Sequence, residues 1–346
     1  MTNIHEGPTS QDASALDLAM RLRQMISAYQ VSQAIHVAAM LGLPDLLKGG
    51  AKPCDHLAQV TGADEDGLYR LLRALAGVEI FTEVAPRTFA LTPLAALLQS
   101  DVDGSLHALA VLNGQDWFWR PWGRLDDGVR TGSSVFEPIF GVHFFEYLQQ
   151  NPAARAVFQK ALAGASSHAA VADMYDFSAS RRVADIGGGH GALIAAILGK
   201  YPQVHGILLE RAAVLEGAKR YLEGAGVLDR CDLMDGDFFT SISAEADTYL
   251  LSQVLHDWSD EAALRILSNC RKAMAPDGKI LVVERVLPEG GAQKGPLMDL
   301  NILVLMGGRE RTQKEYDVLL LRAGFRTTRV LEMGEAWSLI EGVPTE

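Results

Sequence analysis

The chain has 346 residues, a length that suits two domains, with 48% apolar and 21% charged residues. A net charge of −12 and the lack of any run of Lys and Arg argue against nucleic acid as a partner. The three cysteines are far apart and form no CxxC pair, which argues against a disulfide framework and a zinc site and favours a cytoplasmic setting. The polar start lacks the apolar core of a signal peptide, and no apolar stretch reaches the ~18 residues that a membrane span needs.

The first 104 residues predict a tail followed by a helical domain. Residues 1–15 are polar and are expected to be disordered. Residues 16–104 carry mainly helical patterns, and the apolar residues between Ile26 and Leu41 cover more than one amphipathic stripe. Such a helix needs partners on most sides, which either its own domain or a second subunit can supply.

A helix-turn-helix pattern follows. A short helix opens at Pro53, residues 61–63 make a turn, and Asp64 begins a run of three acidic residues where the next helix starts. Residues 80–84 and 88–92 predict two short strands, so the outline is that of a winged helix. A nucleotide-sensing transcription regulator is one alternative, but three acids at a recognition helix would repel DNA phosphates.

Residues 105–175 are expected to form a helical connection that lines the substrate site. Their aromatic residues suggest a flat, apolar ligand, although aromatic residues at this density are also typical of a protein core. The residues that we expect to contact the substrate are Trp117, Phe144 and Phe158, together with Asn301 in a later apolar helix.

Residues 176–346 are expected to form a catalytic domain in which strands and helices alternate. Strands are predicted over residues 182–186, 206–210, 248–251 and 279–284, and a further strand should end near Asp235. Helices are predicted over residues 192–198 and 213–222. This alternation implies a parallel, doubly wound α/β sheet.

A glycine-rich loop follows the first of these strands. Gly187 and Gly189 let the backbone approach a ligand at a helix N-terminus, and Asp185 could meet a cationic amino group. Glu210 ends the next strand and could accept hydrogen bonds from both hydroxyls of a ribose. A dinucleotide-binding fold has the same features, so an NAD-dependent dehydrogenase is an alternative.

Two details favour S-adenosylmethionine as the cofactor. The loop is GxGxG after an acidic residue, and not a full GxGxxG. Asp237 could accept a hydrogen bond from an adenine amino group while Phe238 covers the ring. The loop and Asp237 could instead be plain turns.

Three residues at the ends of later elements form a candidate catalytic group. His256 follows the fourth strand, Glu284 ends the next one, and Glu310 lies beyond the apolar helix. A phenol has a pKa near ~10, so an imidazole that takes its proton makes it a better nucleophile, and a carboxylate on the other ring nitrogen fixes the tautomer. Alternatively, His256 is a capping or core residue and the glutamates are solvated. No carboxylate cluster predicts a dedicated Mg²⁺ site.

Together, the motifs at 185–189, 256–261 and 307–312 resemble the plant-type small-molecule O-methyltransferases, a family that includes caffeate, acetylserotonin, hydroxyneurosporene and anthracycline O-methyltransferases. The resemblance covers roughly residues 20–345. It implies a Rossmann-like methyltransferase domain after a helical, winged-helix-like dimerisation domain, a homodimer, and S-adenosylmethionine as the methyl donor.

The resemblance also implies roles for the site residues. His256 corresponds to the general base that helps transfer a methyl group to a hydroxyl of a small, aromatic, natural-product-like molecule. Trp258 resembles the tryptophan that flanks the adenine, while Glu210, Asp237 and Phe238 match the ribose and adenine contacts.

One position departs from the family pattern. Plant members commonly carry Lys four residues before the histidine, where this chain has Ser252. A lysine-mediated cofactor contact is therefore in doubt, and a backbone carbonyl and a hydroxyl remain near the cofactor.

Other reactions on the same cofactor and fold are alternatives. C- or N-methylation is the nearer one. Hydroxylation, decarboxylation and pericyclic chemistry are disfavoured by the intact set of His256, Glu284 and Glu310, because relatives with such activities often lose the base.

Overall fold

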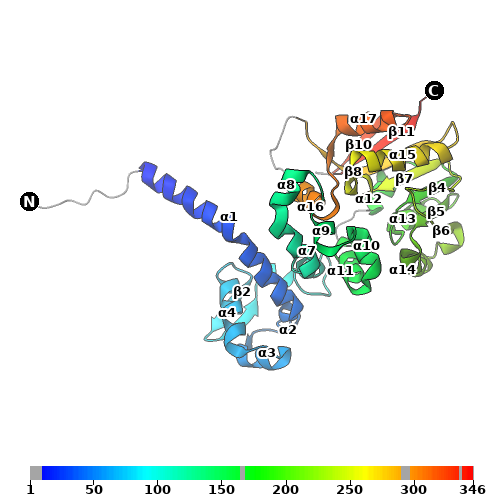
Figure 1. Cartoon of the computed structure of the whole chain (residues 1–346). Helices are drawn as coiled ribbons and strands as arrows, with labels where there is room; N and C mark the ends of the chain where they lie inside the picture. Colours follow the sequence, from blue (N-terminus) through cyan, green and yellow to red (C-terminus); the bar gives the residue numbers. More distant parts are fainter. Residues whose placement is uncertain (1–9, 164–167, 290–296, 335–336, 346) are drawn as a thin grey trace, which may run out of the picture. The chain divides into compact units, whose positions relative to one another are not determined.

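The computed structural model describes residues 10–163, 168–289, 297–334 and 337–345 (Figure 1). The chain divides into two compact units, Met1–Arg120 with Pro152–Ala165 and Pro121–Asn151 with Ser166–Glu346. The expected connection at 105–175 is therefore shared between the two units. Within the described residues, none of the helices combines the length and the apolar character that crossing a lipid bilayer requires.

The first unit begins with the long helix α1 (Ser10–Met40), so helix covers part of the predicted tail, and residues 1–9 lie outside the described residues. Its first three residues are polar and gave no apolar periodicity from which to predict a helix. The other elements of this unit are α2 (Leu43–Leu46), β1 (Lys52–Pro53), α3 (Cys54–Thr61), α4 (Glu65–Ala76), β2 (Phe81–Ala85), β3 (Thr88–Leu91), α5 (Pro93–Ala96), α6 (His107–Asn113), α7 (Asp116–Trp119) and α11 (Pro152–Ala163).

The predicted winged helix is present in this unit. The side chain of Asp64 caps α4 by accepting a hydrogen bond from the backbone N–H of Gly67 at 2.8 Å. Strands β1, β3 and β2 form a small antiparallel sheet in that order. Arg87, at the tip of the hairpin, forms ion pairs with Glu65 at 2.7 Å and with Asp66 at 3.2 Å. The acidic residues that open α4 are thus partnered within the unit.

Helix α1 keeps an apolar stripe exposed to solvent. The side chains lie three or four residues apart, on one face of the helix. They are Leu18, Leu22, Met25, Ile26 and Tyr29, each between 53% and 65% exposed. Burial within the unit therefore accounts only for the far end of the helix, where Ala38 is fully covered.

The second unit is built around one large sheet. Its helices are α8 (Leu125–Thr131), α9 (Phe136–Phe140), α10 (Phe144–Gln150), α12 (His168–Met174), α13 (Ala192–Lys200), α14 (Ala212–Gly224), α15 (Asp260–Ala273), α16 (Leu297–Met306) and α17 (Gln313–Arg322). Short 3-10 turns are η1 (Arg120–Arg124, at the border of the units), η2 (Leu228–Arg230) and η3 (Leu255–Asp257). Its strands are β4 (Arg182–Ile186), β5 (His205–Glu210), β6 (Cys231–Asp235), β7 (Thr248–Ser252), β8 (Lys279–Leu287), β9 (Arg311–Thr312), β10 (Phe325–Met333) and β11 (Trp337–Pro344).

The strand order is β10-β11-β8-β7-β4-β5-β6, and β9 pairs with β8 outside this path. Strands β4 to β8 run parallel, as the sequence predicted, which confirms the Rossmann-like α/β class. The antiparallel pair β10 and β11 was not predicted. Strand β10 alternates poorly, because most of its residues are partly or fully exposed at the sheet edge.

Helices cover both faces of the sheet. One face packs against α15 and α17, around Tyr249, Ile266 and Tyr316. The other packs against α12, α13 and α14, around Phe177, Ile197 and Leu222. With both faces buried, the carboxyl ends of the parallel strands are the edge at which polar side chains can gather.

Candidate active site

The predicted cofactor residues lie at the carboxyl edge of the parallel sheet. Asp185 and the glycine loop follow β4, Glu210 ends β5, Asp237 follows β6, and Ser252 ends β7. The parallel register aligns these ends, since Ile186 pairs with Leu209, and Ser252 with Val283 one residue before Glu284. Residues that are far apart in the sequence therefore share one edge, as expected for a doubly wound sheet.

The glycine loop is held against its surroundings at two positions. A side chain at Gly187, which has a φ of 71°, would meet the Phe238 ring at 3.2 Å and the Val254 methyl at 3.3 Å. A side chain at Gly188 would lie 2.3 Å from the Asp185 carboxylate. Side chains are thus excluded at these two positions, whereas a side chain at Gly189, just before α13, would meet open space.

Asp185 is fully buried beneath this loop. Neither of its oxygens has a hydrogen-bond partner among the described residues. Burial, together with the nearby charge of Glu210, raises the pKa of Asp185 to about 7. An unpartnered carboxylate below the glycine loop is suited to a cationic ligand above it, although the burial does not favour direct contact.

Glu210 binds the loop and faces the same edge. Its Oε2 accepts a hydrogen bond from the N–H of Gly189 at 3.1 Å, and its Oε1 accepts one from the N–H of Arg211 at 2.8 Å. Burial raises the pKa of Glu210, and the two backbone donors oppose that rise. Glu210 therefore links the glycine loop after β4 to the end of β5.

Asp237 is engaged by the protein itself. It accepts a hydrogen bond from the N–H of Phe239 at 2.9 Å and forms an ion pair with Arg211 at 2.9 Å. The backbone carbonyl of Phe238 accepts a hydrogen bond from Asn269 at 2.8 Å. Arg211 was missed by the sequence analysis, because nothing local links it to a residue 26 positions later.

Trp258 lies among aromatic rings. It contacts Phe239 edge-on at 4.6 Å and stacks on His143 with ring centroids 4.9 Å apart and an angle of 11° between the planes. Burial lowers the pKa of His143, so the stacked imidazole is neutral near pH 7. The motif that singled out Trp258 gave no signal for His143, which comes from a distant helix-capping position.

Ser252 lines a cavity of about 270 Å³. Val283 of β8, Met333 of β10 and Trp337 of β11 also line this cavity.

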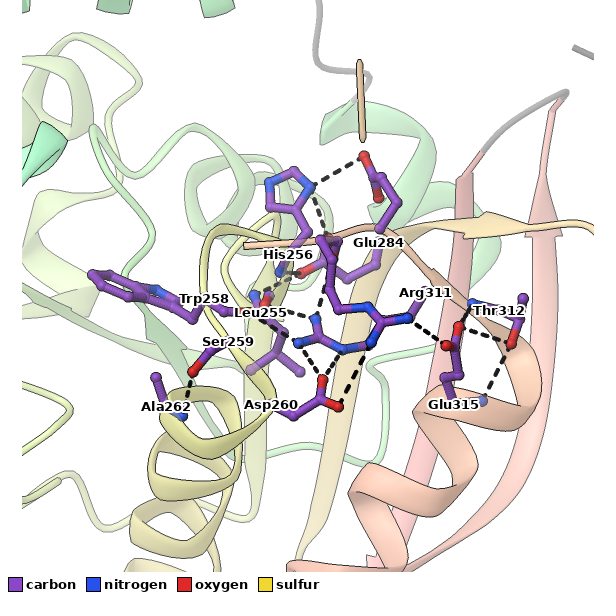
Figure 2. A network of polar contacts seen from close by, with 12 residues as sticks. Leu255, His256, Trp258, Ser259, Asp260, Ala262, Glu284, Arg311, Thr312 and Glu315 are labelled. Carbon is purple, nitrogen blue, oxygen red and sulfur yellow. Dashed lines mark hydrogen bonds and ion pairs between the residues drawn. The ribbon is translucent and has the colours of Figure 1, made fainter. Parts of the chain in front are cut away.

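His256 and Glu284 form the centre of the candidate catalytic group (Figure 2). One oxygen of Glu284, Oε1, accepts hydrogen bonds from the backbone N–H groups of Val254, Leu255 and His256 at 3.0, 2.8 and 3.3 Å. The other oxygen, Oε2, lies 3.4 Å from Nδ1 of the His256 ring. Glu284 is fully buried, so it is not solvated, and it does not end its strand as predicted, because β8 continues to Leu287. One carboxylate thus binds the backbone around the histidine through hydrogen bonds and lies at ion-pair distance from its ring.

Two further carboxylates flank the same ring. Oε1 of Glu310 lies 3.5 Å from Nδ1, and Oδ1 of Asp257 lies 3.4 Å from Nε2. Burial opposes a charge on the imidazole, but Glu284, Asp257 and Glu310 outweigh it and raise the pKa of His256 to about 10. Burial and the neighbouring glutamates raise the pKa of Asp257 to about 7. Asp257 was not among the predicted site residues, although it adjoins His256 in the sequence.

The segment after α16, residues 307–310, packs against the backbone of His256. The N–H of Arg309 donates to the carbonyl of His256 at 2.8 Å, and the N–H of Glu310 donates to Asp299 at 2.8 Å. A side chain at Gly308 would lie 2.1 Å from that carbonyl oxygen, so only glycine permits this approach. The sequence analysis had identified this segment for Glu310 alone.

The predicted substrate residues divide between the two units. Trp117 and the partly buried Phe158 belong to the first unit, and Phe144 and Asn301 to the second. Trp117 is 6% exposed, and Phe144 is fully buried against Phe136, which favours the core alternative for both. Asn301 accepts a hydrogen bond from Nε1 of Trp122 at 3.0 Å, which fixes its amide plane.

The catalytic group also has the composition of a metal site. Donor atoms of His256, Glu284 and Glu310 all lie within 4.8 Å of one another, so the three side chains could hold a cation. The same atoms form the ion pairs described above, and a protonated imidazole balances the carboxylates equally well.

Comparison with known proteins adds the family. An O-methyltransferase domain model matches residues 122–326, and an O-methyltransferase dimerisation domain model matches residues 23–101. The chain belongs to the O-methyltransferase family. It is 43% identical to the phenazine O-methyltransferase PhzM of Lysobacter antibioticus, over 96% of this chain and 98% of that protein.

Solved structures of this family agree with the fold. The mitomycin 7-O-methyltransferase MmcR superposes with a TM-score of 0.93 at 38% identity, covering 96% of this chain and 99% of that one. The neocarzinostatin-pathway O-methyltransferase NcsB1, at 30% identity and a TM-score of 0.83 over 91% and 96%, was solved with S-adenosylhomocysteine and 1,4-dihydroxy-2-naphthoic acid.

These findings confirm the predicted enzyme class, the predicted cofactor and the predicted dimerisation domain. The chain is an S-adenosylmethionine-dependent methyltransferase that acts on small, natural-product-like molecules. Its first unit carries the dimerisation domain of the family, and not a DNA-reading module. The dehydrogenase and regulator alternatives are therefore wrong.

Proposed function

We propose that this enzyme methylates a hydroxyl group of a small aromatic molecule, with His256 as the general base. The observation that carries this proposal is the arrangement around the imidazole. Two buried carboxylates, Glu284 and Glu310, lie near Nδ1, while Nε2 lies 3.4 Å from Oδ1 of Asp257. A base oriented in this way can accept the proton of a hydroxyl and be stabilised as an imidazolium.

The cofactor supplies an electrophilic methyl group on a positively charged sulfur. Glu210 and the glycine loop would hold its nucleoside part, and Asp185 lies beneath the loop as an uncompensated carboxylate. A cation in the site disfavours protonation of His256, which makes the imidazole available as a base in the loaded enzyme. The protein then has to align the acceptor oxygen and take its proton.

The test is a methyl-transfer assay with a panel of acceptors. A hydroxyphenazine and 1,4-dihydroxy-2-naphthoic acid are suitable, because relatives act on or bind such molecules. We expect an O-methyl product, identified by mass and by the methyl chemical shift in NMR. His256→Ala should leave cofactor affinity nearly intact and slow turnover by roughly 10² to 10⁴-fold. Wild-type turnover in His256→Ala would show that His256 is not the base.

N-methylation is the second candidate, because relatives of comparable similarity carry it out. The phenazine-1-carboxylate N-methyltransferase of Pseudomonas aeruginosa is 33% identical over 92% of this chain and 96% of that protein. Phenazine-1-carboxylate therefore belongs in the same panel. A ring nitrogen has no proton to lose, so an N-methylated product whose formation is insensitive to His256→Ala would favour this candidate.

A repurposed reaction is suggested by the name of one of the similar proteins. The aclacinomycin 10-hydroxylase RdmB of Streptomyces purpurascens is 37% identical over 92% of this chain and 85% of that protein. The presence of His256 between its carboxylates supports methyl transfer here. We also expect methyl transfer to continue after EDTA treatment, since a base of this kind needs no metal, and loss of activity that Mg²⁺ restores would contradict this.

A further inference from the structure

We propose that Arg311 is the positioning residue that holds His256 in place for methyl transfer, an inference that rests on the proposed function of His256. Arg311 is 1% exposed, which is unusual for an arginine. It lies in β9, immediately after Glu310, and no motif assigned it a role. Its guanidinium group lies beneath η3, the short turn that carries His256 (Figure 2).

The contacts of Arg311 surround the histidine on both sides. Nη1 donates to the carbonyl of Leu255 at 2.9 Å, and Nη2 donates to the carbonyl of Trp258 at 2.9 Å. Nη2 and Nε both reach Oδ1 of Asp260, at 2.8 and 3.0 Å. One planar group therefore binds Leu255, which precedes the histidine, and both Trp258 and Asp260, which follow it.

Glu284, which carries the opposite charge, binds the same turn. Its Oε1 accepts the N–H groups at the start of η3, while Arg311 donates to carbonyls at its start and end. A buried charge needs such partners, and removing them from either side leaves unpaired polar groups. The backbone of the turn that carries His256 is thus held between an anion and a cation, and these backbone contacts do not depend on the imidazole.

Lysine cannot replace this arrangement. Its ammonium is a point charge, whereas the guanidinium is a planar fork that reaches several acceptors at once. In Arg311→Lys the charge remains buried, but η3 loses simultaneous bonds at both ends. A displacement of the base by about 1 Å can cost roughly 10²-fold in rate. His256 should also move away from Glu284 and Glu310, which weakens two of the three carboxylate interactions that raise its pKa, the third being that with Asp257.

The experiment compares Arg311→Lys with Arg230→Lys. Arg230 is a matched control, because it too donates to backbone carbonyls, those of Leu198, Tyr201, Pro202 and Val204, at the opposite end of the sheet. The pKa of His256 is measured by NMR on histidine-labelled protein, with the signal assigned from His256→Gln. We expect the pKa to fall toward 6.5 in Arg311→Lys and to stay unchanged in Arg230→Lys.

Turnover provides the second readout, with the panel acceptor that the wild-type enzyme methylates. Arg311→Lys should lower kcat roughly 10 to 100-fold in the wild-type background and less than ~2-fold in the His256→Ala background. Should Arg311→Lys not fold, Asp260→Asn provides a second variant, because it removes the carboxylate that binds the Arg311 guanidinium. It should also lower the pKa of His256.

Two results would overturn the proposal: an unchanged His256 pKa in the folded variant, or equal losses of turnover in both backgrounds. If His256 is not the base, His256→Ala will be active. The NMR titration of His256 in Arg311→Lys still tests the positioning role of Arg311 in that case.

Discussion

At the scale of single residues, the raised pKa of His256 dictates how activity should depend on pH. The imidazole is held protonated by its carboxylate neighbours, and only its neutral form can act as a base. Turnover should therefore be lost as the pH falls through a midpoint that lies above 6.5, the ordinary histidine value. Glu310→Gln removes one charge from Nδ1 and should move this midpoint down. A profile of kcat against pH checks both expectations, and a midpoint at or below 6.5 in the wild type would contradict them.

Asp185 should show a conflict between stability and binding. A carboxyl whose folded pKa is raised from 3.8 to about 7 destabilises the fold as the pH rises through that interval, by at most ~4 kcal/mol above it. Asp185→Asn should therefore raise the melting temperature more at pH 8 than at pH 5. The same change should weaken S-adenosylmethionine binding in calorimetry, because the loop loses its anion. Equal stabilisation at both pH values would show that the carboxylate is not the cause.

Glu210 should contribute to cofactor affinity in two ways, by its acceptor oxygens and by its bond to Gly189. Glu210→Ala should reduce S-adenosylmethionine affinity at least ~10-fold, since charge-assisted hydrogen bonds are worth ~1.5 to 3 kcal/mol. Titration calorimetry measures this, with Glu216→Ala in α14 as a control for loss of a glutamate in the same unit. Wild-type affinity in a folded Glu210→Ala protein would remove Glu210 from the cofactor site.

At the scale of elements, the approach of the segment after α16 to η3 depends on Gly308. A methyl group there would lie 2.1 Å from the His256 carbonyl oxygen and 2.6 Å from the Trp258 nitrogen. Neither backbone can move without displacing the catalytic turn, so Gly308→Ala should lower turnover by roughly 10²-fold. Gly199→Ala is the control, because its position in α13 has open space. Turnover assays on the two variants should differ, and a fully active Gly308→Ala enzyme would refute this account.

The elements that the sequence predicted are those with local patterns. Apolar runs revealed β4, β5, β7 and β8, and the glycine loop could be identified because it joins a strand to a helix. Contacts across the fold gave no such signal. The pairing of Arg211 with Asp237 and the stacking of His143 on Trp258 join segments that only the folded chain brings together. For the same reason, aromatic residues such as Phe144 could not be divided between core and pocket from composition.

At the scale of the whole molecule, the exposed stripe of α1 bears on assembly. Three of its five large apolar side chains, Met25, Ile26 and Tyr29, lie in the segment that matches the family's dimerisation domain, and Leu18 and Leu22 precede that segment. We expect a homodimer that covers this stripe, since isologous pairs are the commonest way to bury such a surface.

Ile26→Glu tests this expectation, because it places a charge at the most exposed position of the stripe, which is 65% accessible. Light scattering at micromolar concentration should give twice the chain mass for the wild type and a smaller mass for Ile26→Glu. Arg23→Glu, which is exposed on the same helix, should keep the wild-type mass. A monomeric wild type would contradict the expectation directly.

The turn that carries the histidine is anchored almost wholly through its main chain. Glu284 accepts its N–H groups, Arg309 binds the carbonyl of His256, and Arg311 binds those of Leu255 and Trp258. Position 256 can therefore exchange its side chain while the surrounding scaffold persists. A substitution of His256 should therefore remove the base while the main-chain course of the turn stays in place. Divergence of activity in this lineage would then require neither refolding nor a new donor pocket.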